Sequence, residues 1–266
     1  MHGLNVVVCV KQVPRLEEAE IDFETGTLKR KGIECETNPF DLNALEEALR
    51  IREKLGGRVI ALSMGPPQAE EVLRSSIAMG VDEAILLSDV ALAGADTLAT
   101  SYTLSCAMRR LGGHDLIICG EKTTDGDTGQ VGPELAEHLG IPLVLCVQKI
   151  EKIDEGGLTV QRAVENGYQL VESPLPCLIT VTKDINAPRL PTLRGKIEAR
   201  KRIIAVWGVK ELEEFGDRSR FGLEGSPTKV VNLSTPPQPK KGLKMEGSSS
   251  EQAAKLVSKL KDLGAL

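Results

Sequence analysis

The sequence is poor in aromatic residues, with 4 Phe, 2 Tyr and 1 Trp among 266 residues. Proteins that bind single-stranded nucleic acids stack the bases on aromatic side chains, and proteins that bind duplexes need a basic face. This chain has few rings and a net charge of -5. We therefore expect no nucleic-acid partner and a core built from Val, Ile, Leu and Ala.

Long apolar runs are also missing. No stretch approaches the roughly 18 apolar residues of a membrane-spanning helix. The first residues, MHGLNVVVCV, lack the charged start and the cleavage site of a signal peptide. These absences predict a cytoplasmic protein without direct insertion into a membrane.

Patterns for metal binding and for side-chain catalysis are absent from the sequence. The six cysteines include no CxxC pair and the three histidines form no cluster, so we expect no metal site. Cys9, Cys119, Cys146 and Cys177 lie in or beside apolar runs, as small core residues of a reducing compartment do. No Ser/His/Asp or Cys/His set is visible, and no catalytic residue is predicted.

What is present is a regular alternation of short apolar runs with helical patterns over the first 150 residues. The apolar runs predict strands at 4–10, 58–65, 83–89, 115–120 and 142–147, and the patterns between them predict helices at 41–57, 67–80, 97–112 and 134–140. The strands are apolar on both faces, so they indicate an α/β fold with a mostly parallel sheet flanked by helices.

The pattern changes in the second half of the chain. Residues 151–182 read as short strands with turns at 156–157 and 166–167, which favours an antiparallel extension of the sheet. A further hairpin is expected at 19–32, with its turn at 24–26. The segment 184–202 is rich in Pro and then basic, and it is predicted to be a loop.

The C-terminal end reads as an arm. From residue 226 the chain is too rich in Pro, Ser and Lys to build a core. A final helix at 251–263 has Ala253, Leu256, Leu260 and Leu263 on one stripe, so it must dock on its own domain or on another chain. We therefore divide the chain into a domain of residues 1–225 and an arm of residues 226–266.

The loop GEKTTDGDTGQVGPE at 120–134 is the longest and most polar segment that follows a strand. Gly126 and Gly129 let the backbone approach a ligand closely. The helix expected to begin between Thr128 and Pro133 presents free N–H groups, which suit a diphosphate. The hydroxyl and amide groups of Thr124, Thr128 and Gln130 add neutral hydrogen bonds.

Two carboxylates complicate a phosphate site in this loop. Asp125 and Asp127 repel phosphate, so they must turn away, cap loop amides or accept hydrogen bonds from sugar hydroxyls. A Walker loop, a DxDxT phosphatase nucleophile, a calcium loop and a GxGxxG motif all fail on spacing or context. The residues alone thus favour a nucleotide-binding protein, and a purely structural glycine-rich turn stays open.

A second candidate is the sequence Asn38-Pro39-Phe40-Asp41. Asn38 suits an N-cap, Pro39 the first helical position and Asp41 the third. One reading is a well-made helix start and no more. The other adds a nucleotide beside the cap, through its base or a ribose hydroxyl, because Asp41 disfavours a phosphate there.

Several stretches resemble the beta (small) subunit of electron transfer flavoprotein. They are VVVCVKQVP at 6–14, NPFDLNALEEALRIRE at 38–53, ALSMGPPQAEEVLRSSIAMGVDEAILL at 61–87, DGDTGQVGPELAEHLG at 125–140 and PRLPTLRGKIEARKRI at 188–203. Arg15 departs from the family pattern, in which an Asp is commoner. The resemblance implies a nucleotide-binding fold similar to that of adenine nucleotide alpha-hydrolases.

The resemblance also implies a cofactor. Ordinary members hold AMP in the small subunit, whereas electron-bifurcating members hold a second FAD there that is reduced by NADH; the loop residues of this chain are more similar to the second branch. The residues expected to bind the cofactor are Cys9, Asn38, Pro39, Phe40, Asp41, Met64, Gly65, Thr124, Asp127, Thr128, Gly129, Gln130 and Val131.

The partners implied by the resemblance are the alpha (large) subunit, an acyl-CoA-type dehydrogenase, and ferredoxin or flavodoxin. The segment 184–202 resembles the partner-recognition loop of the family, with Leu193 as its apolar tip. The arm 226–266 is expected to wrap the large subunit. An alternative of another class is a stand-alone nucleotide-binding stress or sensor protein, which would be stable without a partner.

Overall fold

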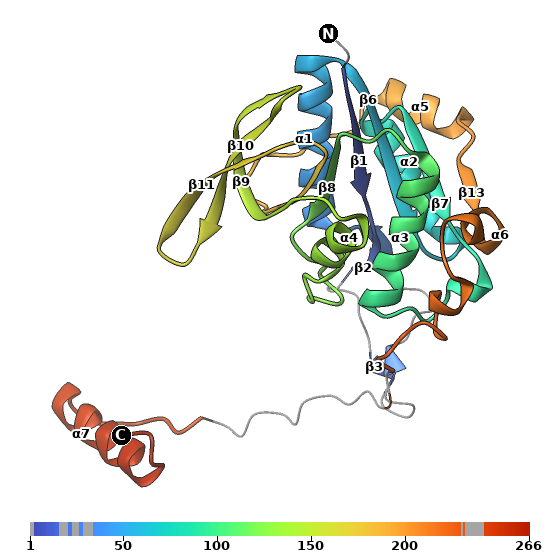
Figure 1. Cartoon of the computed structure of the whole chain (residues 1–266). Helices are drawn as coiled ribbons and strands as arrows, with labels where there is room; N and C mark the ends of the chain where they lie inside the picture. Colours follow the sequence, from blue (N-terminus) through green and yellow to red (C-terminus); the bar gives the residue numbers. More distant parts are fainter. Residues whose placement is uncertain (1–2, 16–20, 23–26, 29–33, 230, 232–241) are drawn as a thin grey trace. The chain divides into compact units, whose positions relative to one another are not determined.

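The computed structural model describes residues 3–15, 21–22, 27–28, 34–229, 231 and 242–266 (Figure 1). The chain forms two compact units, one of residues 1–22 and 28–231 and the other of residues 23–27 and 232–266. The domain boundary at 225/226 stays a prediction.

The first unit is built on a nine-stranded sheet with the order β11-β10-β9-β12-β8-β1-β6-β7-β13. Its strands are β1 Leu4–Cys9, β6 Gly57–Met64, β7 Glu83–Leu87, β8 Leu116–Gly120, β9 Leu143–Asp154, β10 Gly157–Val164, β11 Gly167–Ser173, β12 Cys177–Val181 and β13 Ala205–Trp207. The pairings are parallel except for β9-β10 and β10-β11. The mostly parallel sheet and its antiparallel extension are confirmed.

Helices cover both faces of this sheet. They are α1 Pro39–Leu55, α2 Glu70–Met79, α3 Thr97–Leu111, α4 Val131–Leu139, α5 Leu193–Lys201 and α6 Val209–Leu212, with short 3-10 turns at Pro67–Ala69, Val90–Leu92, Glu213–Phe215 and Arg218–Arg220. Val6 and Val8 of β1 pack in one core cluster with α1 and α2, whereas Val7 packs in the other with α3 and α4. Side chains of a strand alternate between faces, so one apolar strand serves both clusters.

The strand order reverses between β1 and β8. The chain runs from β1 through α1 to β6 and through α2 to β7 on one side, and then crosses by α3 to β8 on the other side of β1. Cys9 at the end of β1 is in register with Cys119 of β8 and with Leu62 of β6. Open α/β sheets bind ligands at such a reversal, beyond the carboxyl ends of the strands.

Two small sheets accompany the large one. β2 Gln12–Pro14 pairs antiparallel with β5 Cys35–Thr37. β3 Ile21–Asp22 and β4 Thr27–Leu28 form a two-stranded sheet, as predicted for a hairpin, and the expected turn at 24–26 falls outside the described residues.

The expectation that all of 151–182 belongs to the antiparallel extension is wrong for its last strand. β12 returns to the middle of the sheet and pairs parallel with both β8 and β9. All five of its residues are buried. A strand buried on both faces belongs in a parallel region covered by helices. This burial explains why CLITV is apolar except for Thr180, whose hydroxyl oxygen accepts a hydrogen bond from the Cys146 N–H.

The expectation that 184–202 is a loop is also wrong for its second half, because residues 193–201 form helix α5. Thr192 caps this helix, since its hydroxyl oxygen accepts a hydrogen bond from the Gly195 N–H at 2.9 Å. Arg200 and Lys201 in the last turn complement the helix dipole. Apart from Gly195, most residues of the segment are good helix formers, so the cap and the basic last turn act with its intrinsic propensity.

The second unit contains helix α7, Ser249–Asp262, which matches the predicted helix at 251–263. A capping box begins it, with reciprocal hydrogen bonds between Ser248 and Glu251. Leu256 and Leu263 of the predicted stripe are 49% and 68% exposed, which leaves an apolar face available to another surface. Residues 232–241 of the arm fall outside the described residues.

No helix in the described part of the chain has the length and apolar character needed to cross a bilayer. Among the same residues, no three His, Cys, Asp or Glu side chains gather into a possible metal site. Cys119 and Cys177 are buried as expected of core residues, whereas Cys9 and Cys146 are half-buried.

Candidate functional site

Segments that follow β1, β6 and β8 meet at the switch point. Lys11, just after β1, contacts the loop after β8, because its Nζ lies 2.8 Å from a carboxylate oxygen of Asp125. Gln12 contacts the turn after β6, because its Nε2 donates to the Gln68 carbonyl at 3.2 Å. Lys11 and Gln12, just after β1, therefore connect the loop after β8 with the turn after β6, the two segments expected to surround a ligand.

Asn38 ties the start of α1 to the loop after β8. It occupies the N-cap position as predicted, but its side chain makes no capping bond. Its Nδ2 donates instead to the Lys122 carbonyl and to Asp41, each at 2.9 Å, and its Oδ1 accepts from the Thr124 N–H at 3.3 Å. This fully buried amide thus fixes the entrance of the glycine-rich loop.

Asp41 is a buried carboxylate at the centre of this arrangement, with 5% of its surface exposed. It accepts hydrogen bonds from Asn38 and, at 2.8 Å, from the Lys11 N–H. Burial raises the pKa of Asp41 to about 7, although the hydrogen bonds from Asn38, Lys11 and Gly120 oppose this rise. Asp41 therefore changes charge near neutral pH beside the expected nucleotide.

The two aspartates that would repel phosphate are each paired with a lysine. Asp125 pairs with Lys11, and Asp127 pairs with Lys122 at 2.8 Å. Burial alone would raise the pKa of Asp125, but the hydrogen bonds from Lys11 and Thr123 outweigh it and lower the pKa. Asp127 has φ 52°, a left-handed conformation that directs the chain around the tip of the loop.

Helix α4 begins at Val131 with an open N-terminus. Gln130 at the N-cap position makes no side-chain cap; its Oε1 accepts a hydrogen bond from the Thr97 hydroxyl. Gly129, with φ 62°, turns the chain into the helix. The first N–H groups of a helix have no partner inside it and attract anions, so this end of α4 suits a phosphate.

The remaining predicted residues lie around this point with different exposures. Thr124, Gly129 and Val131 are half-buried, and Asp127, Thr128 and Gln130 are exposed. Outside this loop, Cys9 at the end of β1, Met64 and Gly65 at the end of β6 and Phe40 of α1 are half-buried, and Pro39 of α1 is exposed. The half-buried apolar groups form the drier side of the site and suit an adenine ring, whereas the exposed loop suits sugar and phosphate.

Cys9 lies on this drier side, next to a second thiol on the adjacent strand. Its side chain is hydrogen-bonded to that of Cys119 on the adjacent strand, which together with burial and the nearby Asp41 raises the pKa of the Cys119 thiol well above its usual range. Cys119 therefore stays protonated at neutral pH, and it acts as a small packing residue.

Lys11 and Lys122 are site residues that the sequence reasoning missed. The signal of Lys122 was present in the sequence, because it lies only five residues before Asp127. The pairing of Lys11 with Asp125 spans 114 residues and becomes visible only in the fold. Leu193 does not belong to this site. It begins helix α5 and is 77% exposed.

Known proteins similar to this chain identify its family. The sequence profile of the electron transfer flavoprotein domain matches residues 25–212. The chain belongs to the electron transfer flavoprotein family. It is 47% identical over 97% of its length to the electron transfer flavoprotein subunit beta of Thermoanaerobacterium thermosaccharolyticum, and 98% of that relative is covered.

Two further relatives belong to named reductase systems. This flavoprotein-family chain is 43% identical to subunit CarD of the caffeyl-CoA reductase-Etf complex of Acetobacterium woodii and 40% identical to the acryloyl-CoA reductase electron transfer subunit gamma of Anaerotignum propionicum. Each match covers 97% of this chain and 98% of the relative. The chain is thus a full-length match to beta-subunit proteins of the family.

The residues present fit an adenine nucleotide. The N-terminus of α4 lacks a side-chain cap, and lysines balance both loop aspartates. A Cβ added at Gly126 would meet only the Thr123 hydroxyl, at 3.4 Å, so the loop backbone is open on that side. This combination of an uncapped helix end, balanced charge and open backbone suits a ligand with a diphosphate.

Proposed function

We propose that this chain is the small subunit of a heterodimeric, electron-bifurcating electron transfer flavoprotein. Its switch-point site binds the adenosine diphosphate half of FAD. The observation that carries this proposal is the loop of residues 124–131, which is exposed at its tip and open at the helix end. The open tip leaves room for the ligand to extend beyond AMP.

Each part of the site has a role in binding. Cys9, Phe40, Met64 and Gly65 line the adenine side, and the Asn38–Asp41 pair fixes their spacing from the loop. The hydroxyl groups of Thr124 and Thr128 face ribose or phosphate in this assignment, with Asp127 and Gln130 beside them. The N–H groups of Val131 and Gly132 hold the diphosphate.

When bound, FAD supplies the redox chemistry, which is acceptance of a hydride from NADH and delivery of single electrons to two acceptors. The proposed acceptors are ferredoxin or flavodoxin on one branch and an acyl-CoA-type dehydrogenase, reached through the FAD of the alpha subunit, on the other. The names of the two reductase-system relatives support an acyl-CoA-type partner. The chain itself supplies binding, orientation and partial exclusion of water.

Docking of the dehydrogenase is assigned to helix α5. Leu193 and Ile197 lie four residues apart, on one side of the helix, and are 77% and 48% exposed. Arg194, Lys196, Arg200, Lys201 and Arg202 surround them, against the single acid Glu198. This surface suits a partner with an apolar pocket rimmed by carboxylates. The arm and α7 are proposed to hold the alpha subunit.

The alternative is a non-bifurcating small subunit that holds AMP. Cofactor stoichiometry separates the two. The chain is co-expressed with its alpha subunit, the purified complex is denatured, and the released nucleotides are quantified by chromatography. Two FAD per heterodimer, with bleaching of the flavin absorbance by NADH, is the expected result. One FAD and one AMP would establish the alternative, and the absence of a second adenine nucleotide would overturn the site.

A further inference from the structure

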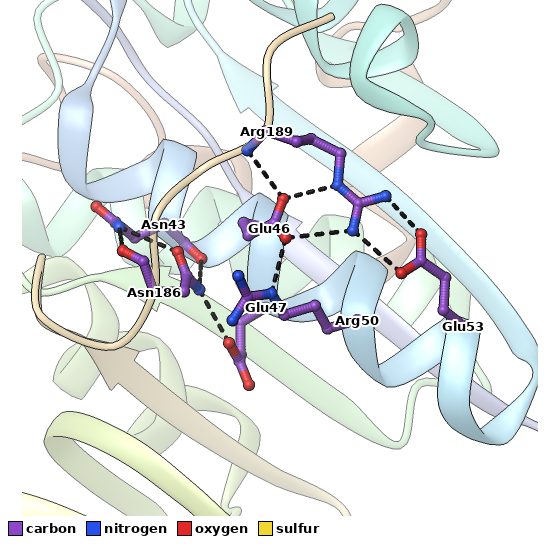
Figure 2. Close-up of polar contacts among 7 residues, drawn as sticks. All are labelled: Asn43, Glu46, Glu47, Arg50, Glu53, Asn186 and Arg189. Atoms are coloured by element: carbon purple, nitrogen blue, oxygen red, sulfur yellow. Dashed lines mark hydrogen bonds and ion pairs between the residues drawn. The ribbon is translucent and has the colours of Figure 1, made fainter.

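We propose that Arg189 is a positioning residue that presets Leu193 for docking by holding the segment before α5 against α1. This inference rests on the proposed docking role of Leu193. The contacts involved are drawn in Figure 2, which shows α1 and the segment after β12 joined by side chains from both. We call Asn43, Glu46, Glu53, Asn186 and Arg189 the α1 clamp.

Arg189 forms the ionic half of the clamp. Its Nε and its own backbone N–H both donate to one carboxylate oxygen of Glu46, at 2.7 and 3.1 Å, and its Nη2 donates to the other at 3.2 Å. The guanidinium also binds both carboxylate oxygens of Glu53. The planar fork of Arg suits such paired contacts, so the backbone of residue 189 is fixed as well as its side chain.

The carboxylate of Glu46 is buried, with 4% of its side chain exposed. Burial alone would raise its pKa, but the hydrogen bonds from Arg189 and Arg50 outweigh burial and lower the pKa. A buried ion pair adds little net stability because desolvation offsets the attraction. Its larger effect is to select one geometry for the segment that carries Arg189.

Asn43 and Asn186 form the neutral half. Asn43 Nδ2 donates to the Asn186 carbonyl at 2.9 Å, and Asn186 Nδ2 donates to the Asn43 carbonyl at 3.0 Å. Asn186 also donates to Glu47 at 2.9 Å. These exchanged bonds hold the segment at Asn186, three residues before Arg189, so its backbone is fixed at two successive points on α1.

Helix α5 is fixed on the far side of Leu193. A Cβ added at Gly195 would lie 2.2 Å from the Ala78 carbonyl oxygen of α2, so the two helices touch backbone to backbone there. Arg74 of α2 donates to the Ala199 carbonyl at 2.7 Å. Four residues span at most about 14 Å, so Leu193 is confined between Arg189 and Gly195.

The fixed points at Arg189 and Gly195 explain why the exposed apolar side chain of Leu193 keeps a defined position. Leu190 and Leu193 are 88% and 77% exposed, so neither gains order from packing in the core. A docking residue that is ordered before the encounter loses less conformational entropy on binding. The clamp therefore acts on association with the dehydrogenase and not on the cofactor.

The test uses the heterodimer, a purified acyl-CoA dehydrogenase as the acceptor protein, and ferricyanide as an acceptor that needs no docking. We expect Arg189→Ala to raise KM for the dehydrogenase about fivefold to tenfold, while ferricyanide reduction reports an intact flavin. Arg50→Ala is the matched control, since Arg50 binds the same Glu46 carboxylate from within α1 at 2.7 Å. It is expected to leave KM unchanged.

A double-mutant cycle with Leu193→Ala gives the decisive result. If Arg189 acts through Leu193, Arg189→Ala adds little to KM in the Leu193→Ala background. Additive effects, or a normal KM for Arg189→Ala alone, would overturn the positioning role. A normal KM for Leu193→Ala would overturn the docking assignment and this inference with it, so the two failures are distinguishable.

Amide hydrogen exchange supplies a readout that is independent of turnover. We expect faster exchange at residues 184–192 in Arg189→Ala than in the unchanged protein, and unchanged exchange would contradict the clamp. If Arg189→Ala fails to fold, Arg189→Lys keeps the charge without the forked geometry. It is expected to give an intermediate KM, and a KM equal to that of the unchanged protein would count against the proposal.

Discussion

Two connections leave the same edge of the sheet from neighbouring strands, and helix α1 holds both by different means. The loop after β8 is held by Asn38 and Asp41 at the first turn of α1. The segment after β12 is held further along by Asn43, Glu46 and Glu53. The first connection is held by a neutral amide, Asn38, and by a carboxylate with a raised pKa, Asp41. The second depends on Arg189, which lies between the two acids Glu46 and Glu53.

The difference matches what each connection presents. The loop after β8 is fixed at its entrance and leaves N–H groups of its backbone available to a ligand. The segment after β12 is fixed along its backbone and leaves side chains, Leu190 and Leu193, available to a partner. In the proposed function, the first connection binds a small molecule and the second docks on a partner protein.

The largest effect is expected from Gly120→Ala, which disturbs the start of the loop after β8. The new Cβ would lie 2.4 Å from Asp41 Oδ1 and 2.8 Å from Phe40 Cβ. We expect a loss of about 2–3 kcal/mol in the free energy of unfolding and loss of the bound nucleotide. Chemical denaturation and nucleotide extraction measure both. Gly242→Ala, where a Cβ meets nothing within 4 Å, is the control, and full nucleotide retention by Gly120→Ala would contradict the assigned geometry.

Leu193→Ala changes the segment after β12 and is expected to leave the loop after β8 intact. The flavin content stays unchanged, and electron delivery to an acyl-CoA dehydrogenase slows about tenfold, as for an apolar anchor at an interface. Stopped-flow kinetics with the heterodimer measure the transfer. Val90→Ala, at a side chain that is 92% exposed elsewhere in the first unit, is the matched control. Unchanged transfer kinetics in Leu193→Ala would remove the assignment.

The pH dependence of stability should separate the two sets of acids. With a pKa of about 7 in the folded state, Asp41 holds a proton that the unfolded chain releases, so its contribution to stability is lost as the pH rises through 7. We expect the free energy of unfolding to fall by about 1.4 kcal/mol between pH 6 and pH 8 relative to Asp41→Asn. Denaturation midpoints at several pH values measure this difference.

Glu46 and Glu53 behave in the opposite sense. Their pKa values are lowered in the folded state, by the balance of burial and arginine hydrogen bonds at Glu46 and by the Arg189 hydrogen bond at Glu53. Their contribution is present above the pKa of the unfolded chain and is lost only as the medium becomes acidic. If the free energy of unfolding still falls between pH 6 and pH 8 in Asp41→Asn, groups other than Asp41 cause the pH dependence.

The smallest effect on stability is expected from Lys11→Ala. The Lys11–Asp125 pair is partly exposed, and such pairs contribute about 0–1 kcal/mol. The variant nevertheless leaves the charge of Asp125 unbalanced beside the phosphates, so we expect nucleotide affinity to fall about threefold to tenfold. Adding Asp125→Asn is expected to restore it. Titration calorimetry measures both, and no recovery in the double variant would show that Lys11 contacts the ligand directly.

The sequence was sufficient wherever the decisive contacts are local. The alternation of apolar runs predicted the parallel strands, and Asn38-Pro39 predicted the start of α1. The glycines and threonines around 124–131 predicted an open helix N-terminus, and α4 begins at Val131, inside the interval 128–133 expected for its start. Strand period, caps and turn residues are properties of a few neighbouring positions, so a single sequence contains them.

The sequence was insufficient where the contacts cross the fold. The Asn38 side chain leaves its own helix for partners more than 80 residues away, and Arg189 reaches Glu46 over 143 residues. The central place of β12 depends on a return across the sheet that no local pattern contains. Helix α5 was not predicted: its Thr192 cap is local, but the close approach of Gly195 to the Ala78 carbonyl of α2 is a contact that a single sequence does not contain.

The length of helix α1 sets the spacing and the relative orientation of the residues that hold the two connections. Its 17 residues span about 25 Å, with Asn38 and Asp41 at the N-terminal end and the α1-clamp residues Asn43, Glu46 and Glu53 farther along. Inserting or deleting one residue between Asp41 and Asn43 would turn every clamp acid by about 100° and leave the cap in place. The length of this helix therefore fixes the angular register between the proposed cofactor site and the proposed docking helix, and a change of length there is expected to separate two functions that point substitutions alter one at a time.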